Sequence, residues 1–410
     1  MNVLGIIAEY NPFHNGHIYH IKKAKEMTNA DYVILVMSGN FTQTGNIAVL
    51  NKFERAKIVC EYGINLVIEL PTIYATSSAE YFATGAVNLL DKLGIVNYIC
   101  FGTEEKDIEN LKSIAKIIID NEKNIYENIR IELKKGITFA KARQITISKY
   151  LPTNSEINYT DILSKPNNIL GIEYLKALNK LNSTIIPYSL YRDTANHNDT
   201  KANDDSSITS ATAIRNLLKV NDLENIRKYI PENMYNELIK SKICLNEDMY
   251  KLIKYKILTM DKEDLSQINE VTEGLENRII EANLNSKSYE ELVENIKSKR
   301  YVETKIRRIL INILLGIKKD IFSEAISKNI TYAHILSMNG NGKKLLSQIS
   351  KKSNIELLAS INNKLLENID NKISYLLNLD ILASNIHSSI SNSDINLDFY
   401  NKLSDEKDTQ

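Results

Sequence analysis

Short apolar runs alternate with segments of helical spacing through the first hundred residues, and this alternation limits the fold more than any other feature of the chain. Runs rich in Val and Ile predict strands at residues 3–8, 32–37, 65–70 and 97–101. The segments between these strands have helical spacing, at residues 17–27, 52–62 and 79–93. Apolar strands separated by helices are typical of a parallel sheet covered on both faces. We therefore predict an α/β fold with a doubly wound parallel sheet, whose ligands bind beyond the carboxyl ends of the strands.

The pattern changes along the rest of the chain. Helices are predicted at residues 108–121, 126–149 and 168–181, a strand at 183–188 and, after a polar segment at 192–207, a helix at 207–220. From about residue 230 the strand-like runs end and helical periodicity continues. We therefore predict two domains, an α/β domain over residues 1–235 and an all-helical domain over residues 236–410.

Composition excludes several classes of protein. The chain has 51 Lys and Arg against 51 Asp and Glu, so it is not a globally basic binder and DNA is not an expected partner, although local basic patches are allowed. No apolar run has the length needed to span a membrane. Cys60, Cys100 and Cys244 lie far apart, which fits reduced thiols better than disulfides or a zinc site. We expect a cytoplasmic protein without a membrane partner.

His14, Gly16 and His17 form an H-x-G-H motif where the first predicted strand gives way to a helix. Histidines three residues apart share a helix face, so both imidazoles can point at one ligand. A helix N-terminus attracts phosphate, Gly16 lets a ligand approach the backbone, and imidazoles can donate to phosphate oxygens as negative charge develops. The motif predicts a phosphate site with catalytic His14 and His17. Two alternatives stay open: a histidine pair that only caps the helix, and a metal site joined by Glu9.

A second anion-binding element is predicted at residues 207–215, again at the start of a helix. Ser207, Thr209 and Ser210 supply hydroxyls and Arg215 supplies a guanidinium. Hydroxyls at helix starts are common caps, so this element alone is weak. Its combination with H-x-G-H favours a nucleotide site.

H-x-G-H after the first strand, together with an S-x-T-x-I-R-like element, resembles the signature of the nucleotidyltransferase superfamily. The resemblance narrows to the bacterial tRNA(Met) cytidine acetate ligase family. It is carried by AEYNPFHNGHIYHI, SGNFTQTGNIAVLNKFERA, VIELPTIYATSSAEYFATGAV, FGTE, KPNNILGIEYLKAL, TEGLENRI and SKRYVETKIRRIL, which are spread over nearly the whole chain.

The resemblance implies an ATP-dependent ligase. ATP and acetate give acetyl-adenylate and pyrophosphate. The acetyl group then passes to the exocyclic amine of the wobble cytidine in elongator tRNA(Met), which becomes N(4)-acetylcytidine. Mg²⁺ is expected with ATP. Residues 1–235 would be the nucleotidyltransferase-like catalytic domain that binds ATP, and residues 236–410 the domain that docks tRNA.

The resemblance also assigns ATP-binding residues. The first group surrounds the motif: Ile7, Ala8, Glu9, Tyr10, Asn11, Pro12, Phe13, His14, Asn15, Gly16, His17, Ile18, Tyr19 and His20. The second group is Gly102, Asn167, Asn168, Arg192, Ser207, Thr209, Ser210 and Arg215. Gly102 would approach the adenine or ribose, and Arg192 the phosphates. One of Asn167 and Asn168 would cap a helix while the other binds ATP.

Residues 297–319 contain eight Lys and Arg against one acidic residue, Glu303. The residues expected to bind tRNA are Lys299, Arg300, Lys305, Arg307 and Arg308, with Tyr301 able to stack on a base. A solvated helix face is the alternative interpretation of such a charge run.

One segment departs from the family, which usually has the sequence F-T-Q-R-G-E-P-A. Thr44 and Asn46 replace the arginine and the glutamate here. Lys52 or Arg55 is expected to compensate if that arginine contacts RNA or phosphate. Two other functions stay open at this point: an adenylyltransferase of cofactor biosynthesis that uses a small phosphorylated substrate, and a catalytically silent tRNA-binding protein.

Overall fold

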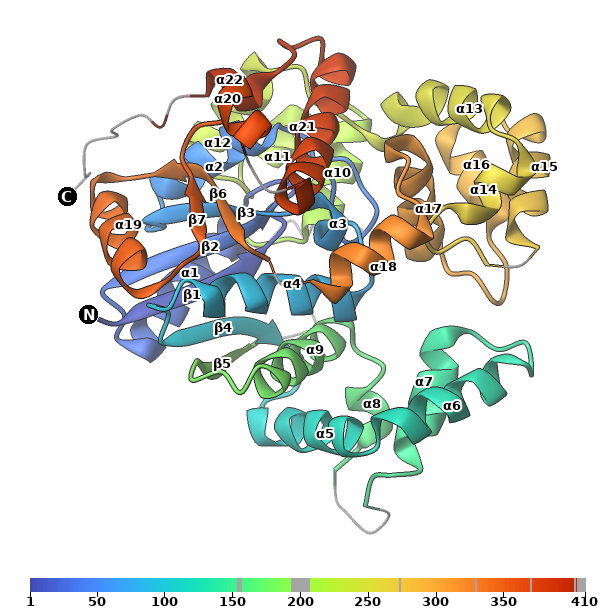
Figure 1. Cartoon of the computed structure of the whole chain (residues 1–410), viewed down its shortest axis with the longest axis horizontal. Helices are drawn as coiled ribbons and strands as arrows, with labels where there is room; N and C mark the ends of the chain where they lie inside the picture. Colours follow the sequence, from blue (N-terminus) through green and yellow to red (C-terminus); the bar gives the residue numbers. More distant parts are fainter. Residues whose placement is uncertain are drawn as a thin grey trace.

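A seven-stranded sheet forms the centre of the protein (Figure 1). The computed structural model describes residues 1–152, 157–192, 207–272, 274–328, 330–368, 371–401 and 403. The strands are β1 (Val3–Ala8), β2 (Tyr32–Ser38), β3 (Leu66–Leu70), β4 (Tyr98–Thr103), β5 (Ile186–Tyr191), β6 (Tyr332–Met338) and β7 (Glu356–Leu358). Their order is β5-β4-β1-β2-β3-β6-β7. The first five strands are parallel, so their carboxyl ends meet at one edge.

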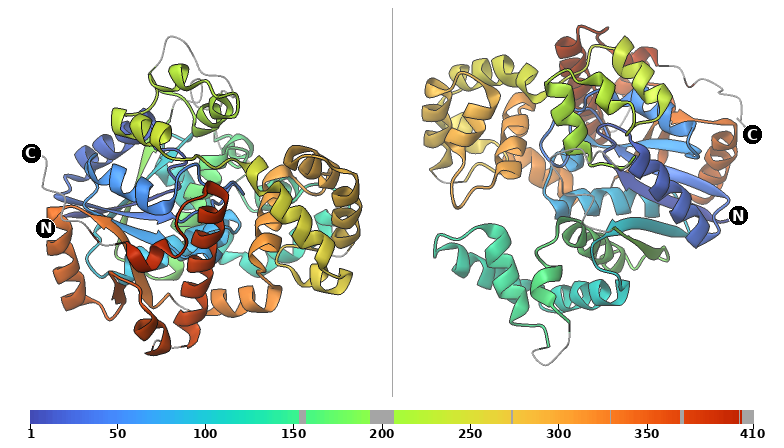
Figure 2. Two further views of the ribbon diagram at one scale, coloured as in Figure 1. Left: turned by 90° about the horizontal axis from the view of Figure 1, so that it is seen from above. Right: turned by 180° about the vertical axis from the view of Figure 1, so that it is seen from behind.

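Helices cover both faces of this sheet, which confirms the doubly wound α/β fold (Figures 1 and 2). One face carries α1 (Asn15–Thr28), α2 (Lys52–Cys60), α10 (Ala211–Lys219), α11 (Leu223–Ile226) and α12 (Glu232–Lys240). The other carries α3 (Thr72–Ala75), α4 (Ala79–Lys92), α5 (Ile108–Asp120) and α9 (Pro166–Lys180). Most residues of β1 to β4 are buried on both sides, which explains why these strands are continuous apolar runs without alternation, whereas the edge strand β5 is half-buried.

Two groups of helices project from the same side of the sheet (Figure 1). The first group follows α5 and contains α6 (Glu122–Leu133), α7 (Phe139–Ser148) and α8 (Tyr159–Ile162). The second contains a short 3₁₀ turn (Asn246–Met249), α13 (Tyr250–Thr259), α14 (Lys262–Gln267), α15 (Leu275–Asn285), α16 (Tyr289–Ile296) and α17 (Glu303–Leu315). The helix predicted over residues 126–149 is split in two, because Gly136 adopts a positive φ of 79° between α6 and α7.

The chain then returns to the sheet. After α18 (Lys319–Ser327), β6 pairs antiparallel with β3 and β7 pairs with β6. The remaining helices are α19 (Gly340–Lys352), α20 (Asn363–Asn368), α21 (Asn371–Ser391) and α22 (Leu397–Tyr400). The prediction that residues 236–410 are all helical is therefore wrong for β6 and β7. All seven residues of β6 are buried, and so short a buried run cannot be told from a buried helix by periodicity. The boundary after residue 235 stays a prediction.

Within the described part of the chain, no helix combines the length and the apolar character required to cross a membrane.

Candidate nucleotide site

The H-x-G-H motif joins the end of β1 to the start of α1. His14 is the N-cap of α1, and its Nδ1 accepts from the Gly16 N–H at 3.1 Å. His17 Nδ1 accepts from the His14 N–H at 3.2 Å, and the two rings stack with centroids 3.6 Å apart. The pair therefore does cap the helix. Because both Nδ1 atoms accept, the neutral imidazoles carry their protons on Nε2, so both can donate through Nε2.

Buried aromatic rings hold this pair in place. Phe13 stacks on His17 with ring centroids 5.8 Å apart, and Tyr10 lies against His17 at 4.5 Å. Tyr10 adopts a left-handed backbone with a φ of 46°, which turns its ring back over the motif. Burial raises the pKa of the Tyr10 hydroxyl, so it stays protonated. These two residues of the predicted ATP set thus orient His17 by packing.

Polar side chains fix the motif loop to its surroundings. The Asn11 amide donates to Ile47 O at 3.0 Å and accepts from Val49 N at 2.8 Å. The Asn15 amide donates to the carbonyls of Ser207 and Lys228, both at 3.0 Å. Every one of these bonds joins segments distant in sequence. The asparagines therefore position the loop.

Arg55 stabilises the chain segments that follow β1 and β2, beside the motif. Its fully buried guanidinium donates to the carbonyls of Glu9, Ser38, Gly39 and Leu50, which connects the ends of β1 and β2. The prediction that Arg55 compensates at position 44 is wrong, because its donors are used inside the protein.

Lys52 is excluded from that role for the same reason. Its fully buried ammonium contacts Glu69 at 2.8 Å and Asp398 at 2.5 Å. Burial alone would lower the pKa of Lys52, but these carboxylates raise it above its usual value. Glu69, His334 and Asp398 have ligand atoms within 4.8 Å of one another, the spacing of a metal site. The Lys52 ammonium already supplies the cation there.

Glu9 lies at the end of β1 beside the motif. Its carboxylate accepts from the Thr44 N–H at 3.2 Å and lies near the Thr44 hydroxyl at 3.3 Å. Burial raises the pKa of Glu9, while Arg215 and the bonds from Thr44 oppose the rise. Among the described residues, the group of acidic, His and Cys side chains close enough together to hold a metal ion contains none of Glu9, His14 and His17. The metal alternative for the motif therefore gains no support.

The second predicted element meets the motif, as the sequence indicates. Ser210 caps α10 by accepting from Ala213 N at 3.1 Å. Arg215, one turn into α10, donates to Asn11 O at 2.6 Å, and burial lowers the pKa of its guanidinium. A Cβ on Gly16 would lie 3.3 Å from the Ile208 side chain. Thr209 is buried beside the Ser210 cap. Because Asn15 at the start of α1 bonds the Ser207 carbonyl, which precedes α10, the N-termini of these two helices lie together.

The ends of β4 and β5 form the other side of the site. The Arg192 guanidinium packs directly over Gly102, where any Cβ would clash with it at 2.0 Å. Burial lowers the pKa of Arg192, while the nearby Glu104 carboxylate opposes the shift. Gly102 is therefore required for close approach, but the group that approaches it here is Arg192.

Asn167 and Asn168 have different surroundings. Buried Asn168 accepts from the N–H groups of Glu104 and Glu105, both at 2.9 Å, and fixes the loop after β4. Asn167 is half-buried, and its amide donates to Glu104 Oε1 at 2.6 Å. Neither asparagine caps α9. Glu104 does so, because its carboxylate accepts from the N–H groups of both. Sequence reasoning missed Glu104, although it is the first acidic residue after β4.

The other predicted ATP residues around the motif differ in their exposure. Tyr19 is exposed, and two helix positions place it on the opposite side of α1 from His17. His20 is buried, and burial lowers its pKa to about 3, so it is neutral at pH 7. Four others, Ile7, Ala8, Pro12 and Ile18, contribute apolar packing or backbone around the motif.

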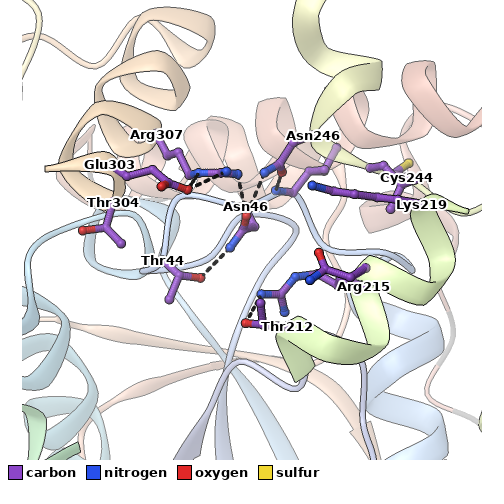
Figure 3. Close-up of a pocket in the computed structure, with 13 residues that line it drawn as sticks. Thr44, Asn46, Thr212, Arg215, Lys219, Cys244, Asn246, Glu303, Thr304 and Arg307 are labelled. Atoms are coloured by element: carbon purple, nitrogen blue, oxygen red, sulfur yellow. Dashed lines mark hydrogen bonds and ion pairs between the residues drawn. The ribbon is translucent and has the colours of Figure 1, made fainter. Parts of the chain in front are cut away.

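A cavity of about 290 Å³ opens next to the motif, between the loop after β2, α10 and α17 (Figure 3). Asn46 lies at its centre. Its Oδ1 accepts from Asn246 Nδ2 at 2.7 Å and from Arg307 Nη1 at 3.3 Å, and its Nδ2 donates to Thr44 Oγ1 at 2.8 Å. Arg215 also lines the cavity. Arg307 thus places a guanidinium beside Asn46 and near Thr44, where the family usually has an arginine, but Arg307 belongs to α17.

The basic stretch is less exposed than its sequence suggests. Carboxylates from other segments or the preceding turn pair with Lys297, Arg307, Arg308 and Lys318. Lys299 and Arg300 are exposed and Lys305 is half-buried. Arg307 lines the first cavity, whereas Arg300, Lys305 and Arg308 line a second one. The structure therefore does not bring the five predicted tRNA-binding residues to one surface.

Comparison with known proteins identifies the family. The HIGH Nucleotidyl Transferase family matches residues 1–401. The chain belongs to this family. It is 41% identical over 398 residues to the tRNA(Met) cytidine acetate ligase of Clostridium novyi, covering 96% of each chain. It is 42% identical over 404 residues to that of Clostridium perfringens, covering 97% of this chain and 98% of the relative. The resemblance predicted from the sequence is confirmed.

Two solved structures have the same fold. The crystal structure of apo Thermotoga maritima TmcAL matches with a TM-score of 0.89 at 33% identity, covering 96% of each chain. The crystal structure of that protein bound with alpha-thio ATP matches with a TM-score of 0.90 at 32% identity, covering 99% of this chain and 100% of that one. These likenesses do not favour the cofactor-biosynthesis alternative.

Proposed function

We propose that this chain catalyses the reaction for which its relatives are named. ATP activates acetate, and the acetyl group passes to the wobble cytidine of elongator tRNA(Met). In the first step an acetate oxygen bonds to the α-phosphorus of ATP, the bond to the bridging oxygen breaks, and pyrophosphate leaves. In the second step the cytidine N4 attacks the acetyl carbonyl, AMP leaves, and N4 loses a proton. The geometry that carries this proposal is the histidine pair, whose Nδ1 atoms are fixed by backbone N–H groups.

ATP would lie across β1 and β4, where the chain order of the sheet reverses. His14 and His17 would donate from Nε2 to the α-phosphate as charge develops. Ser207, Thr209, Ser210, Arg215 and Arg192 would hold the β- and γ-phosphates. Gly102 and Asn167 would contact the ribose or adenine, and Asn168 would position the loop that holds them. The remaining motif-loop residues, including Tyr10 and Phe13, shape the site by packing.

Mg²⁺ would arrive with ATP, bound to its phosphates. In the described residues, the one grouping with metal-ligand spacing surrounds Lys52 and does not fit Mg²⁺. We assign no protein ligand to the ion and no step to it. The three cysteines are buried thiols, which suits a reducing compartment such as the cytoplasm.

The acceptor side would lie over β2, at the cavity lined by Asn46 and Arg307. Lys299, Arg300, Lys305, Arg307 and Arg308 remain the proposed tRNA-binding residues. Their positions on both sides of the start of α17 suggest a path for RNA around that helix.

Acetate-dependent exchange of labelled pyrophosphate into ATP tests adenylate formation without tRNA. The wild-type chain should exchange only when acetate is present. Exchange with phosphopantetheine or a nicotinamide nucleotide, and none with acetate, would contradict the proposal and support a cofactor adenylyltransferase.

A further inference from the structure

A second cavity, of about 510 Å³, lies between α6–α7 and the start of α17. Ile125, Ile129 and Phe139 form an apolar wall. Tyr301 and Lys305 belong to the opposite wall. The two walls come from the two helical groups that project from the same side of the sheet (Figure 1). No residue of the H-x-G-H loop or of the 207–215 element lines this cavity, so it is separate from the nucleotide site.

The start of α17 divides the second cavity from the first. Glu303, Thr304 and Arg307 line the first cavity, whereas Val302, Lys305 and Arg308 line the second. Neighbouring helix positions are turned by about 100°, so one turn of α17 can present side chains to both spaces. A strand that crosses the start of α17 would therefore contact both cavities.

The second cavity contains cations that lack a carboxylate partner among the described residues. Arg308 is paired with Glu270 at 3.2 Å and Arg143 with Glu173 at 2.5 Å. Arg300 and Lys305 have no such ion pair, and both lie over the Tyr301 ring, at 5.6 and 5.2 Å from its centroid. Burial and the neighbouring arginines lower the pKa of Lys305, although Glu270 opposes them. An anion placed beside Tyr301 would relieve this repulsion.

Aromatic and apolar surface adjoins these cations. The Tyr301 hydroxyl bonds to Thr272 Oγ1 at 2.7 Å, which fixes the ring. Phe139 leaves 52% of its surface exposed on the facing wall, and Val302 leaves 44%. Aromatic faces beside cationic groups are the chemistry that binds unstacked bases and their phosphates.

We propose that this cleft binds one unstacked nucleotide of the tRNA substrate, outside the site of acetyl transfer. Its base would lie against Phe139 and the apolar wall, and its phosphate against Arg300 and Lys305. The inference rests on the proposed function, because that function supplies an RNA substrate. It adds a second RNA contact on the far side of α17 from the acceptor cavity.

Binding of an elongator tRNA(Met) transcript to the full chain, measured by filter binding at several salt concentrations, tests the cleft. Phe139→Ser removes a stacking face without changing charge, so affinity should fall roughly 10-fold with the salt slope unchanged. Lys305→Ala removes one phosphate contact, so the slope should become shallower by about 0.7. Tyr255→Ser and Lys256→Ala are matched controls on α13, because Tyr255 is exposed like Phe139, Lys256 is half-buried like Lys305, and neither lines a cavity.

The outcomes separate the cleft from the proposed function. Wild-type affinity in Phe139→Ser, or an equal loss in Tyr255→Ser, would overturn the cleft inference. Pyrophosphate exchange by the wild-type chain, measured without tRNA, reports on the proposed function alone. If acetate-dependent exchange occurs and both cleft variants bind tRNA like the wild type, only the cleft inference fails.

Discussion

His17 has two separable roles, and one substitution can divide them. Its Nδ1 accepts the His14 N–H at 3.2 Å and completes the cap of α1, while its Nε2 carries the proton that the proposed mechanism needs. In His17→Asn the amide oxygen can occupy the position of Nδ1 and keep the cap. No atom then replaces the Nε2–H donor. The variant should fold like the wild type and lose activity.

The size of the expected loss follows from the kind of contact removed. One donor to a developing oxyanion is worth roughly 100- to 1,000-fold in kcat. The cap is worth about 1 kcal/mol of stability, so His17→Ala should lose both activity and about that much unfolding free energy. His17→Asn should lose the activity and keep most of the stability.

Acetate-dependent pyrophosphate exchange measures the activity, and urea unfolding measures the stability. Wild-type exchange rates in His17→Asn would refute the catalytic role of the Nε2 donor. A stability loss in His17→Asn as large as in His17→Ala would refute the proposed division of roles.

Three further predictions follow from buried polar groups. Asn168→Ala leaves the N–H groups of Glu104 and Glu105 without their acceptor, so the KM for ATP should rise by a factor that corresponds to about 1–3 kcal/mol, measured by exchange at varied ATP. Lys52→Met leaves Glu69 and Asp398 facing each other, so urea unfolding should show a loss of about 3–5 kcal/mol, whereas Lys251→Met, at an exposed position of α13, should change little. His20 and His387 are buried with pKa values lowered to about 3 and about 4, so the unfolded chain binds more protons below pH 6.5. Unfolding free energy should therefore fall from pH 6.5 to 5 by up to about 2 kcal/mol for each histidine. His20→Phe should show a smaller fall, and a fall as large as that of the wild type would contradict the role of His20.

The sheet was largely predictable because four of its strands, β1 to β4, obey a simple rule. Strands buried on both faces are short apolar runs, and the loops after them carry polar residues. The run of β6 is equally apolar, but it follows a long helical stretch and contains His334. Nothing local distinguishes it from a buried helix. Its pairing with β3 links residues more than 260 positions apart, which periodicity does not reveal.

The nucleotide site was likewise predictable only in part from the sequence. H-x-G-H and the 207–215 element are local patterns, and the structure brings them together through Asn15 and Arg215. The supporting contacts are not local. Arg55 looks like a surface cation of an amphipathic helix but is fully buried. The contact of Arg307 with Asn46 spans 261 positions, so only the folded chain shows that α17 supplies an arginine beside Thr44.

Transfer of labelled acetate into RNA tests the central claim most directly. The wild-type chain, ATP and labelled acetate should be incubated with a transcript of elongator tRNA(Met), and with a matched transcript whose wobble cytidine is replaced by uridine. The proposed function predicts label in the first RNA, none in the second, and none in either without ATP. Equal label in both transcripts, or none in the first while acetate-dependent exchange proceeds, would contradict it.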